Sequence, residues 1–422
     1  MENTSNVVRL RHPDEIDDPL TDVLRAGARR LLAQAVEMEA EAFLAALQDL
    51  RLPDGRARLV RHGHGPERDI QTGIGPVAVS RVRVRDRGAT GAGNRIRFSS
   101  TILPKWARRT RSLDALLPVL YLRGVSTGDF QEALAALLGK DAPNLSPSVV
   151  TRLTATWAEE YARWQARDLS ARRFVYVWAD GVYLQARMES QAECMLVLIG
   201  ATPEGKKELV GFQVGVRESA QSWRELLVEV KRRGLALAPE IAVGDGAIGF
   251  WRAIDEVFPG TRHQRCWLHK TANVLNKVPK SVQQAMKADL REIHGAPTRA
   301  AAEAALDVFV EKYGAKYARA AECLTKDRVA LLAFYDFPAE HWDHLRTTNP
   351  IESVFATVRH RTVRTKGALS PTTARLMAFK LVMAAGKSWR RLKGENQLPK
   401  VVVGVTFRDG TEVIAPPDHR AA

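Results

Sequence analysis

The sequence has 422 residues, of which 45% are hydrophobic and 26% are charged, and its formal net charge is +15 at pH 7. This length suits roughly two to four modules with separate cores. No apolar run approaches the roughly 20 residues of a membrane span, the polar first 20 residues do not resemble an export signal, and three cysteines without a C-x-x-C pair exclude a disulfide framework. We therefore expect a cytoplasmic protein of several modules.

The positive charge is concentrated in two stretches. Residues 51–112 carry 15 basic and 4 acidic side chains, whereas residues 1–50 carry 5 basic and 10 acidic ones. Residues 359–393 hold ten Lys and Arg and no acidic residue. Such clusters attract a polyanion, because neutralising phosphates releases condensed counterions, although a solvated surface or an acidic protein partner gives the same composition. The distribution of charge favours nucleic acid as the partner.

The first 110 residues combine a helix pattern with a strand pattern. Residues 21–48 place apolar side chains at helical spacing, which predicts one long amphipathic helix. Residues 56–97 contain glycine-rich, period-two stretches, of which Val77–Arg85 is one. They predict a small sheet with one face lined by arginines, namely Arg81, Arg83 and Arg85. This face either contacts DNA or is exposed to solvent.

Residues 112–165 are predicted to form three helices. The first ends at Gly124, a capping-box pattern at Ser126–Asp129 opens the second, and Ser146-Pro147 opens the third. Three short helices indicate a helix-turn-helix or an ordinary helical bundle. In the former case the third helix presents these side chains to DNA: Ser148, Thr151, Arg152 and Thr156.

After Arg172 the pattern becomes α/β. Three strands are expected first, at 174–185, 194–203 and 208–216, with a tight turn at Thr202–Gly205 between the last two. Helices at 222–233 and 250–258 then alternate with strands at 241–244 and 261–268. This order describes a mixed sheet whose later strands run parallel to the first.

The remaining residues are mostly helical in pattern. Residues 270–346 are rich in Ala and Lys and predict an all-helical insertion, and residues 349–393 return to helix. The tail predicts a hairpin around Asp409-Gly410.

Two acids follow apolar strands of the predicted sheet. Asp180 ends the run from Phe174, and Asp245 ends the run from Ile241. Parallel strands open their carboxyl ends on one edge, where ligands bind, and two carboxylates there repel each other unless a cation shares them. A hard divalent ion such as Mg²⁺ or Mn²⁺ resolves this conflict. Alternatively, each Asp-Gly pair only begins a turn.

Glu352 is the third candidate acid, in the first turn of a helix that Asn349 and Pro350 are expected to open as N-cap and N1. Its carboxylate either closes a capping box or faces the sheet edge. Arg359 lies two turns further along the same face. Further basic residues suit a phosphate backbone: Arg361, Arg364 and Lys366. Asp343 is the alternative acid.

Two pairs of Cys or His residues, each separated by two residues, suggest a zinc site. Cys266 and His269 form one pair, and His341 and His344 form the other, so together they offer four ligands. The alternative is a buried cysteine and a hydrogen-bonding histidine that pack the insertion against the sheet.

The sequence resembles the Mutator-type transposases of bacterial insertion sequences over nearly its whole length. The resemblance is specific at Tyr176–Tyr183, at Gly244–Gly246 with Gln264–Lys270, and at Arg346–Ser353 with Arg359–Thr362. Gly124–Ala133 is similar to the helix-turn-helix of the family. The resemblance implies a ribonuclease-H-like fold with a helical insertion before the last acid.

The same resemblance implies a catalytic DDE triad of Asp180, Asp245 and Glu352 that binds two Mg²⁺ or Mn²⁺ ions. Cys266 and His269 match the C-x-x-H signature of the family, and Arg359 matches the basic residue beyond the glutamate. The resemblance implies a protein that binds terminal inverted repeats in double-stranded DNA, cleaves 3′ ends and joins them to a target. Because joining requires two DNA ends to be held together, we expect a homodimer or a higher oligomer on DNA, associated with the nucleoid. A structure-selective nuclease on the same fold and a non-catalytic DNA-binding regulator are the alternatives.

The expected fold class is α/β, a ribonuclease-H-like mixed sheet with a helical insertion behind a mainly helical DNA-binding region with a small sheet. Residues 1–50, 51–110 and 111–170 are expected to form the amphipathic helical segment, the basic small sheet and the helix-turn-helix. The catalytic domain is expected at 171–269 and 347–395, the insertion at 270–346, and the hairpin and tail at 396–422.

Overall fold

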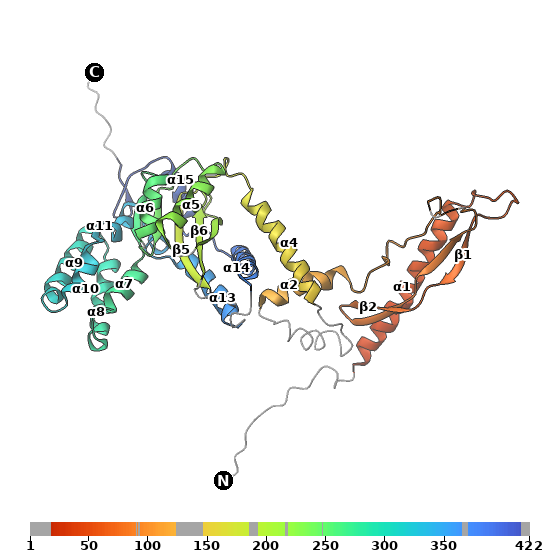
Figure 1. Ribbon diagram of the computed structural model, residues 1–422. Coiled ribbons are helices and arrows are strands. Elements are labelled where there is room, and N and C mark those ends of the chain that lie inside the picture. The colour runs from red at the N-terminus through yellow and green to blue at the C-terminus, as the bar shows by residue number, and fades with distance from the viewer. Residues whose placement is uncertain are drawn as a thin grey trace, which may run out of the picture. The chain divides into compact units, whose positions relative to one another are not determined.

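The computed structural model of the protein describes residues 18–123 except 90 and 92, and residues 147–184, 193–215, 218–246, 248–364 and 370–414. The chain divides into two compact units, Met1–Leu153 and Thr154–Ala422 (Figure 1). Within the described ranges, no helix combines the length and the apolar character that a bilayer span requires.

The first unit contains one long helix and four short strands. Helix α1 (Pro19–Ala46) begins after Asp18, whose carboxylate caps it by accepting the Thr21 N–H. The strands form two antiparallel pairs, β1 (Leu59–His64) with β4 (Val82–Asp86), and β2 (Arg68–Thr72) with β3 (Gly75–Val79). Apolar side chains of the helix, the strands and the segment before α2 share one core: Val36, Ala40, Ile70, Val77, Val79, Val82 and Leu103. The predicted long helix is present, and the strands of the predicted small sheet form two separate two-stranded sheets.

Two further helices match the next predicted segment. Helix α2 (Arg111–Arg123) corresponds to the first of the three expected helices, and α4 (Pro147–Gln165) corresponds to the third. The second expected helix lies outside the described residues, as do the side chains of Ser148, Thr151 and Arg152. The helix-turn-helix therefore stays a prediction.

A five-stranded mixed sheet forms the centre of the second unit, with strand order β7-β6-β5-β8-β9. Its strands are β5 (Tyr176–Leu184), β6 (Glu193–Ala201), β7 (Lys207–Gly215), β8 (Ile241–Gly244) and β9 (Arg262–Arg265). Strands β5, β6 and β7 pair antiparallel, whereas β8 runs parallel to β5 and β9 runs parallel to β8. The predicted strand sequence and the parallel direction of the later strands are confirmed.

The two faces of this sheet carry different helices, because side chains alternate along a strand. Val177 and Ala179 of β5 belong to a core with α5 (Ala220–Arg232) and α6 (Ile248–Val257). On the opposite face, the Tyr176 hydroxyl is 2.7 Å from His341 Nδ1, and Trp178 Nε1 donates to the His344 carbonyl at 2.8 Å. Asp180 follows in the same alternation, so its side chain belongs to this second face.

Helix α13 (Asn349–Arg364) covers that second face and contacts β5 and β6. Its buried side chains follow the spacing i, i+3, i+4, i+7 of one helix face: Ile351, Val354, Phe355 and Val358. Helix α14 (Pro371–Gly386) packs against α13 and β7. Glu352 lies beside the buried stripe of α13 and is therefore carried to the sheet.

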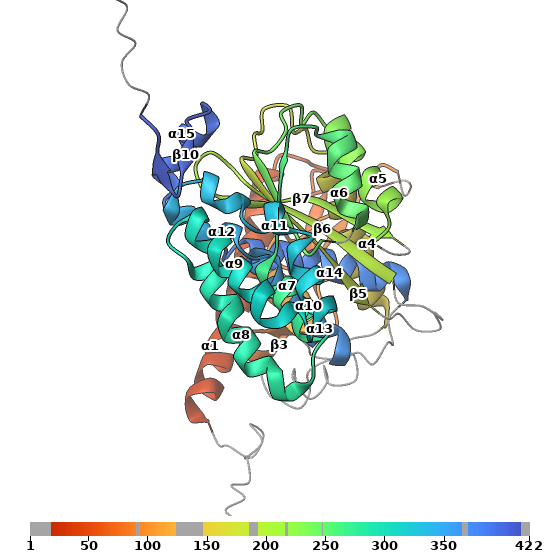
Figure 2. The ribbon, with the colours of Figure 1, turned by 90° about the vertical axis from the view of Figure 1, so that its left-hand side faces the viewer.

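The predicted helical insertion is present as α7 (Trp267–Leu275), α8 (Lys280–Gly295), α9 (Arg299–Gly314), α10 (Ala318–Thr325) and α11 (Arg328–Leu331), and Figure 2 shows α7 to α10 grouped together. Short turns follow: η2 (Ala333–Asp336), η3 (Ala339–His341) and α12 (Trp342–Leu345). Buried polar contacts tie this segment to the start of α7, since Lys270 donates to the Cys323 carbonyl at 2.8 Å and Trp267 Nε1 donates to the Leu331 carbonyl at 2.9 Å.

The C-terminal segment contains η4 (Glu395–Gln397), α15 (Leu398–Val402) and the predicted hairpin, β10 (Phe407–Arg408) with β11 (Thr411–Glu412). Asp409 and Gly410 connect the two strands with φ of +50° and +79°. A tight two-residue hairpin turn requires positive φ at both central residues, and the pair Asp-Gly adopts this conformation readily.

Two predicted boundaries are wrong, whereas the strand expected at 174–185 is confirmed as β5, which continues past Asp180 to Leu184 because β6 pairs with it over its full length. The strand expected at 261–268 stops at Arg265, since the Lys270 N–H donates to the Cys266 carbonyl and a helix begins. Helix α13 starts at Asn349, which is therefore not its N-cap, because the N–H groups of Ile351 and Glu352 both donate to the Thr348 carbonyl.

Candidate active site

Asp180 and Asp245 occupy matching positions on two adjacent parallel strands. The β5–β8 register runs from Tyr176 opposite Ile241 to Ala179 opposite Gly244, and the two aspartates come next on their strands. Strand β8 ends there. Gly246 has φ of +93°, and the Arg265 guanidinium fills the place where a Cβ would be, so glycine is required at this turn. The topology therefore brings both acids to one edge of the sheet, as predicted.

Asp180 is the more deeply buried of the two, with 8% of its surface exposed, and its carboxylate accepts the Gly181 N–H at 2.8 Å. Burial, together with the negative charges of Asp245 and Glu352, raises the pKa of Asp180 to about 7, although the nearby His269 opposes this shift. The two other candidate acids are thus close enough to act on its ionisation.

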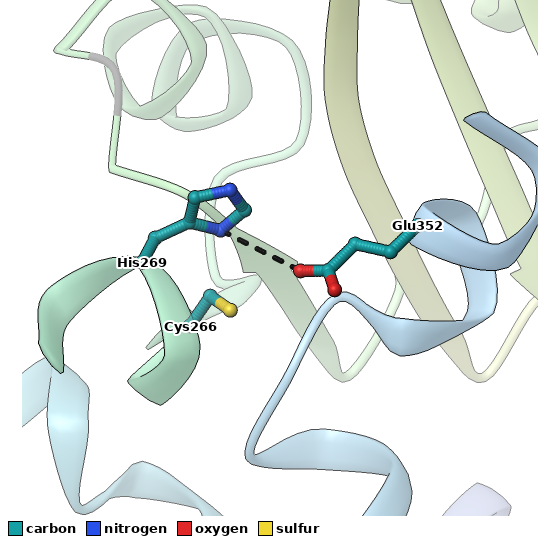
Figure 3. Close-up of side chains that lie close together, drawn as sticks. All are labelled: Cys266, His269 and Glu352. Atoms are coloured by element: carbon teal, nitrogen blue, oxygen red, sulfur yellow. Dashed lines mark ion pairs between the residues drawn. The ribbon is translucent and has the colours of Figure 1, made fainter. Parts of the chain in front are cut away.

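Glu352 faces the start of α7. The Thr348 hydroxyl donates to Glu352 Oε1 at 3.1 Å, and His269 Nδ1 lies 3.9 Å from the same oxygen (Figure 3). A capping box would join the glutamate to the backbone N–H of the residue before the helix. The Thr348 N–H donates instead to Cys266 Sγ at 3.4 Å. Glu352 is therefore not held as a capping-box carboxylate.

Cys266, His269 and Glu352 form a compact group whose sulfur, nitrogen and oxygen ligand atoms lie within 4.8 Å of one another, the one such trio that the described residues contain. Burial raises the pKa of the Cys266 thiol, but hydrogen bonds from His269 and Thr348 outweigh it and leave the pKa below its ordinary value. The hydrogen bond to Cys266, with the charges of Asp180 and Asp245, raises the pKa of His269 to about 9 against the effect of burial. The sequence paired these two residues correctly but did not predict their glutamate partner.

Glu218, just before α5, is a fourth acid that no sequence motif indicated. Its carboxylate lies over Gly181, where it fills the place of a Cβ, and is 3.9 Å from Cys194 Sγ. Burial and the charges of Asp245 and Asp180 raise its pKa to about 7. Glu218 reaches this edge of the sheet from the face that α5 covers, whereas the Asp180 side chain belongs to the opposite face of the sheet. The only sequence signal is Gly181, which leaves room for such a neighbour.

Comparisons with known proteins show the family of the chain. The sequence matches the family described as "Transposase, Mutator family" over residues 1–391. The chain belongs to this family. It is 48% identical over 306 residues to the transposase for insertion sequence element IS6120 of Mycolicibacterium smegmatis, a match that covers 72% of this chain and 94% of the relative.

Two further relatives extend the comparison. This Mutator-family transposase is 51% identical over 294 residues to the transposase for insertion sequence element IST2 of Acidithiobacillus ferrooxidans, which covers 69% of the chain and 99% of the relative. It is 28% identical over 300 residues to the transposase for IS256 in transposon Tn4001 of Staphylococcus aureus, with 70% and 73% covered.

Several predicted residues of the transposase lie away from the acids. His341 contacts Tyr176 and the Gly394 carbonyl, and His344 Nε2 accepts the Lys393 N–H at 3.1 Å, so these histidines do not join Cys266 and His269 in a four-ligand zinc site. The alternative acid Asp343 has 70% of its side chain exposed and pairs with Arg346 at 3.3 Å.

The basic residues expected to contact DNA divide between the two units. Arg359 is exposed on α13, while Lys366 and the side chains of Arg361 and Arg364 lie outside the described residues. In the first unit Arg81, Arg83 and Arg85 are exposed. Val82 and Asp86 between and after them are buried, which confirms the predicted period-two pattern.

Proposed function

We propose that the chain is a DDE transposase that binds the terminal inverted repeats of an insertion sequence, cleaves their 3′ ends and joins them to target DNA. Asp180, Asp245 and Glu352 are its catalytic acids and hold two Mg²⁺ or Mn²⁺ ions. The matched placement of Asp180 and Asp245 at the ends of two parallel strands, with Glu352 on the helix that covers the same strand, is the observation that carries this proposal.

The donor set at this edge fits a hard divalent cation. No ion pair between described residues joins Asp180 or Glu218 to a lysine or an arginine, and His269 is the cation that affects both. Several carboxylates in a partly buried site repel one another unless positive charge is supplied. Oxygen ligands of this kind are those that Mg²⁺ and Mn²⁺ prefer. We include Glu218 as a supporting carboxylate of the centre.

Two such ions, when bound, activate a water or a 3′-hydroxyl on one side of a phosphodiester and stabilise the leaving oxygen on the other. The residues of the chain hold the carboxylate ligands in position. Strand β5 and the end of β8 fix the aspartates in the sheet, and the Thr348 hydroxyl and His269 orient Glu352. Arg359, exposed two turns along α13, suits a phosphate of the bound strand.

We further propose that the exposed arginines of the first unit and the predicted helix-turn-helix bind double-stranded DNA, and that the transposase acts as a homodimer or a higher oligomer. Joining requires that two DNA ends be held together. The mass of the protein complexed with paired ends, measured by light scattering, tests the second point, and a single subunit on two ends would contradict it.

A structure-selective nuclease on the same scaffold is the competing function, and it would cut DNA without joining it. The test supplies pre-cleaved transposon ends, a target duplex and Mg²⁺, and measures joined product. Asp180→Asn should lower the joining rate on the order of 10²–10³-fold or more, the scale on which loss of one charge-stabilising group acts. The control Asp343→Asn changes an exposed acid and should leave joining intact. Cleavage without joined product in the unaltered protein would favour the nuclease.

A further inference from the structure

The trio of Cys266, His269 and Glu352 combines three chemically different ligands from two distant parts of the chain. A sulfur, an imidazole nitrogen and a carboxylate oxygen meet within 4.8 Å, with no histidine or cysteine from elsewhere in the described ranges (Figure 3). Hard ions such as Mg²⁺ avoid sulfur, whereas Zn²⁺ accepts all three donor types. The chemistry of this group therefore differs from that of the carboxylates beside it.

Backbone hydrogen bonds fix the segments that carry these ligands. The Cys266 N–H donates to the Gly244 carbonyl at 2.8 Å, immediately before Asp245, and the Trp267 N–H donates to the Arg346 carbonyl at 2.8 Å. Helix α7 then places His269 one turn beyond Cys266. Ligands that ordered elements hold in place make a metal site more precise than ligands on loops.

The sulfur is placed as a hydrogen-bond acceptor. Cys266 is fully buried, and both the N–H and the hydroxyl of Thr348 lie 3.4 Å from its Sγ. The Thr348 N–H donates to this sulfur, and a buried sulfur that accepts a backbone N–H is suited to the thiolate form, which is the form that binds metal. Thr348 also contacts Glu352, so one residue supports two of the three ligands.

We propose that Cys266, His269 and Glu352 form a binding site for a thiophilic divalent cation of the zinc type, with a fourth position open to water. The Nδ1 of His269 and Oε1 of Glu352 are 3.9 Å apart. Two ligands at about 2.0 Å on one tetrahedral ion are about 3.3 Å apart, so binding requires a side-chain shift of roughly half an ångström. Binding requires a neutral imidazole and a thiolate, because both groups ligate only in their deprotonated forms.

Glu352 would belong both to the zinc site and to the catalytic acids. The functional consequence of this overlap, unlike the zinc site itself, rests on the proposed function. A zinc ion bound to Glu352 withdraws that carboxylate from Asp180 and Asp245. Zinc is therefore an inhibitor of the Mg²⁺-dependent reaction, and Mg²⁺ weakens zinc binding. The alternative for the trio is a purely positioning role, in which His269 orients Glu352 by their ion pair and no metal binds.

Cobalt(II) is the probe that separates these two roles. The full-length protein, free of DNA and Mg²⁺, is titrated with Co²⁺ and its absorption is followed. We expect a sulfur-to-cobalt charge-transfer band in the near ultraviolet together with visible bands of a four-coordinate ion, and Zn²⁺ should remove both. Absence of the charge-transfer band in the folded protein would overturn the proposal.

The three cysteines of the chain provide a matched control. Cys266→Ser should abolish the band and weaken Zn²⁺ binding by at least about 10- to 100-fold, the loss caused even by removing a partner of a metal ligand. Cys323→Ser removes another buried thiol that is not part of the trio and should keep the band. A band that survives Cys266→Ser would overturn the site. His269→Gln gives a second test if Cys266→Ser does not fold, and a band of full strength in that variant would also overturn it.

The inhibitory consequence is tested separately with DNA cleavage in Mg²⁺. Zinc should inhibit the unaltered protein, and a chelator should restore its rate. Full cleavage at zinc concentrations that saturate the site would show that Glu352 is not shared. Absence of any Mg²⁺-dependent cleavage, with the cobalt band intact, would instead remove the proposed function and leave the metal site standing.

Discussion

Each unit of the protein buries an aspartate, but the two aspartates have opposite electrostatic surroundings. In the first unit, Asp86 accepts two hydrogen bonds from Arg58, at 2.9 and 3.0 Å, and further bonds from the N–H groups of Gly88 and Ile96. The side-chain hydrogen bonds from Arg58 hold the pKa of Asp86 well below its usual range, although burial opposes this. In the second unit, burial and neighbouring acids raise the pKa of Asp180 to about 7.

The difference separates a structural carboxylate from a candidate functional one. Asp86 is neutralised by its own chain, so it stabilises the small sheet and offers nothing to a ligand. Asp180 has acids as its neighbours and the partly buried His269 as the nearby cation, so positive charge from outside the chain relieves its repulsion. The surfaces follow the same division, since the first unit exposes arginines that suit a polyanion and the second gathers acids that suit a cation.

Of the tests of this comparison, Glu218→Gln should have the largest effect on metal binding and strand cleavage. If Glu218 belongs to the group of acids that shares the cation, its loss should reduce Mg²⁺-dependent strand cleavage and metal affinity by about 10- to 100-fold, as for other residues that support metal ligands. The control is Glu225→Gln, which changes an exposed acid of α5, the helix that follows Glu218. The Glu225 carboxylate contacts Gln213 and Gln221. Isothermal titration with Mn²⁺ measures the affinity, and equal values for the two variants would exclude Glu218 from the centre.

The dependence of stability on pH, measured without divalent ions, is the second test. Asp86 has a depressed pKa in the folded state, so its contribution is complete above about pH 5 and is lost only in stronger acid. Asp180 shifts from 3.8 to about 7, so the folded state binds its proton more tightly. The free energy of unfolding should therefore fall as pH rises from about 4 to about 7, by a few kcal/mol at about 1.4 kcal/mol per pKa unit. Glu218 acts in the same direction.

Two variants assign these contributions. Asp86→Asn should lower the stability of the first unit at every pH above about 5, because it breaks the pair with Arg58 without adding a titrating group. Asp180→Asn should stabilise the metal-free protein near neutral pH and flatten the slope. Thermal unfolding of the full chain in a chelator measures both. An unchanged slope in Asp180→Asn would mean that other groups cause the pH dependence.

The salt dependence of DNA binding is the smallest expected effect. Replacing the exposed Arg81, Arg83 and Arg85 with alanine should weaken binding at low salt and reduce the slope of log K against log [salt] by up to about 0.9 for each phosphate that is no longer neutralised. Arg56→Ala is the control, since Arg56 is exposed in the same unit but is engaged with Asp54. Filter binding of transposon-end DNA at several salt concentrations gives both slopes, and a triple variant with an unaltered slope would place the DNA elsewhere.

Short-range patterns account for what could be predicted. Period-two and helical spacing located the strands and helices, and the order of strands and helices fixed which strands run parallel. Because Asp180 and Asp245 lie at matching positions of two such strands, their convergence follows from topology alone. The Asp-Gly hairpin at 409–410 was equally local.

Contacts between distant segments could not be predicted in this way. His341 and His344 have the spacing of a ligand pair, yet packing of the insertion directs them to Tyr176, Gly394 and Lys393. Glu218 belongs to no motif, and it reaches the site only because α5 packs on the face of the sheet where Gly181 leaves space. The start of α7 at Trp267 likewise depends on the carbonyls of Gly244 and Arg346.

The sequence by itself therefore determined the elements, their order and the two aspartates, since these depend on backbone propensity and on alternation within a few residues. Only the tertiary structure decided that Glu352 meets Cys266 and His269, and that Glu218 joins the acids. Those contacts depend on how helices pack across the two faces of the sheet, and many different packings are compatible with one local pattern.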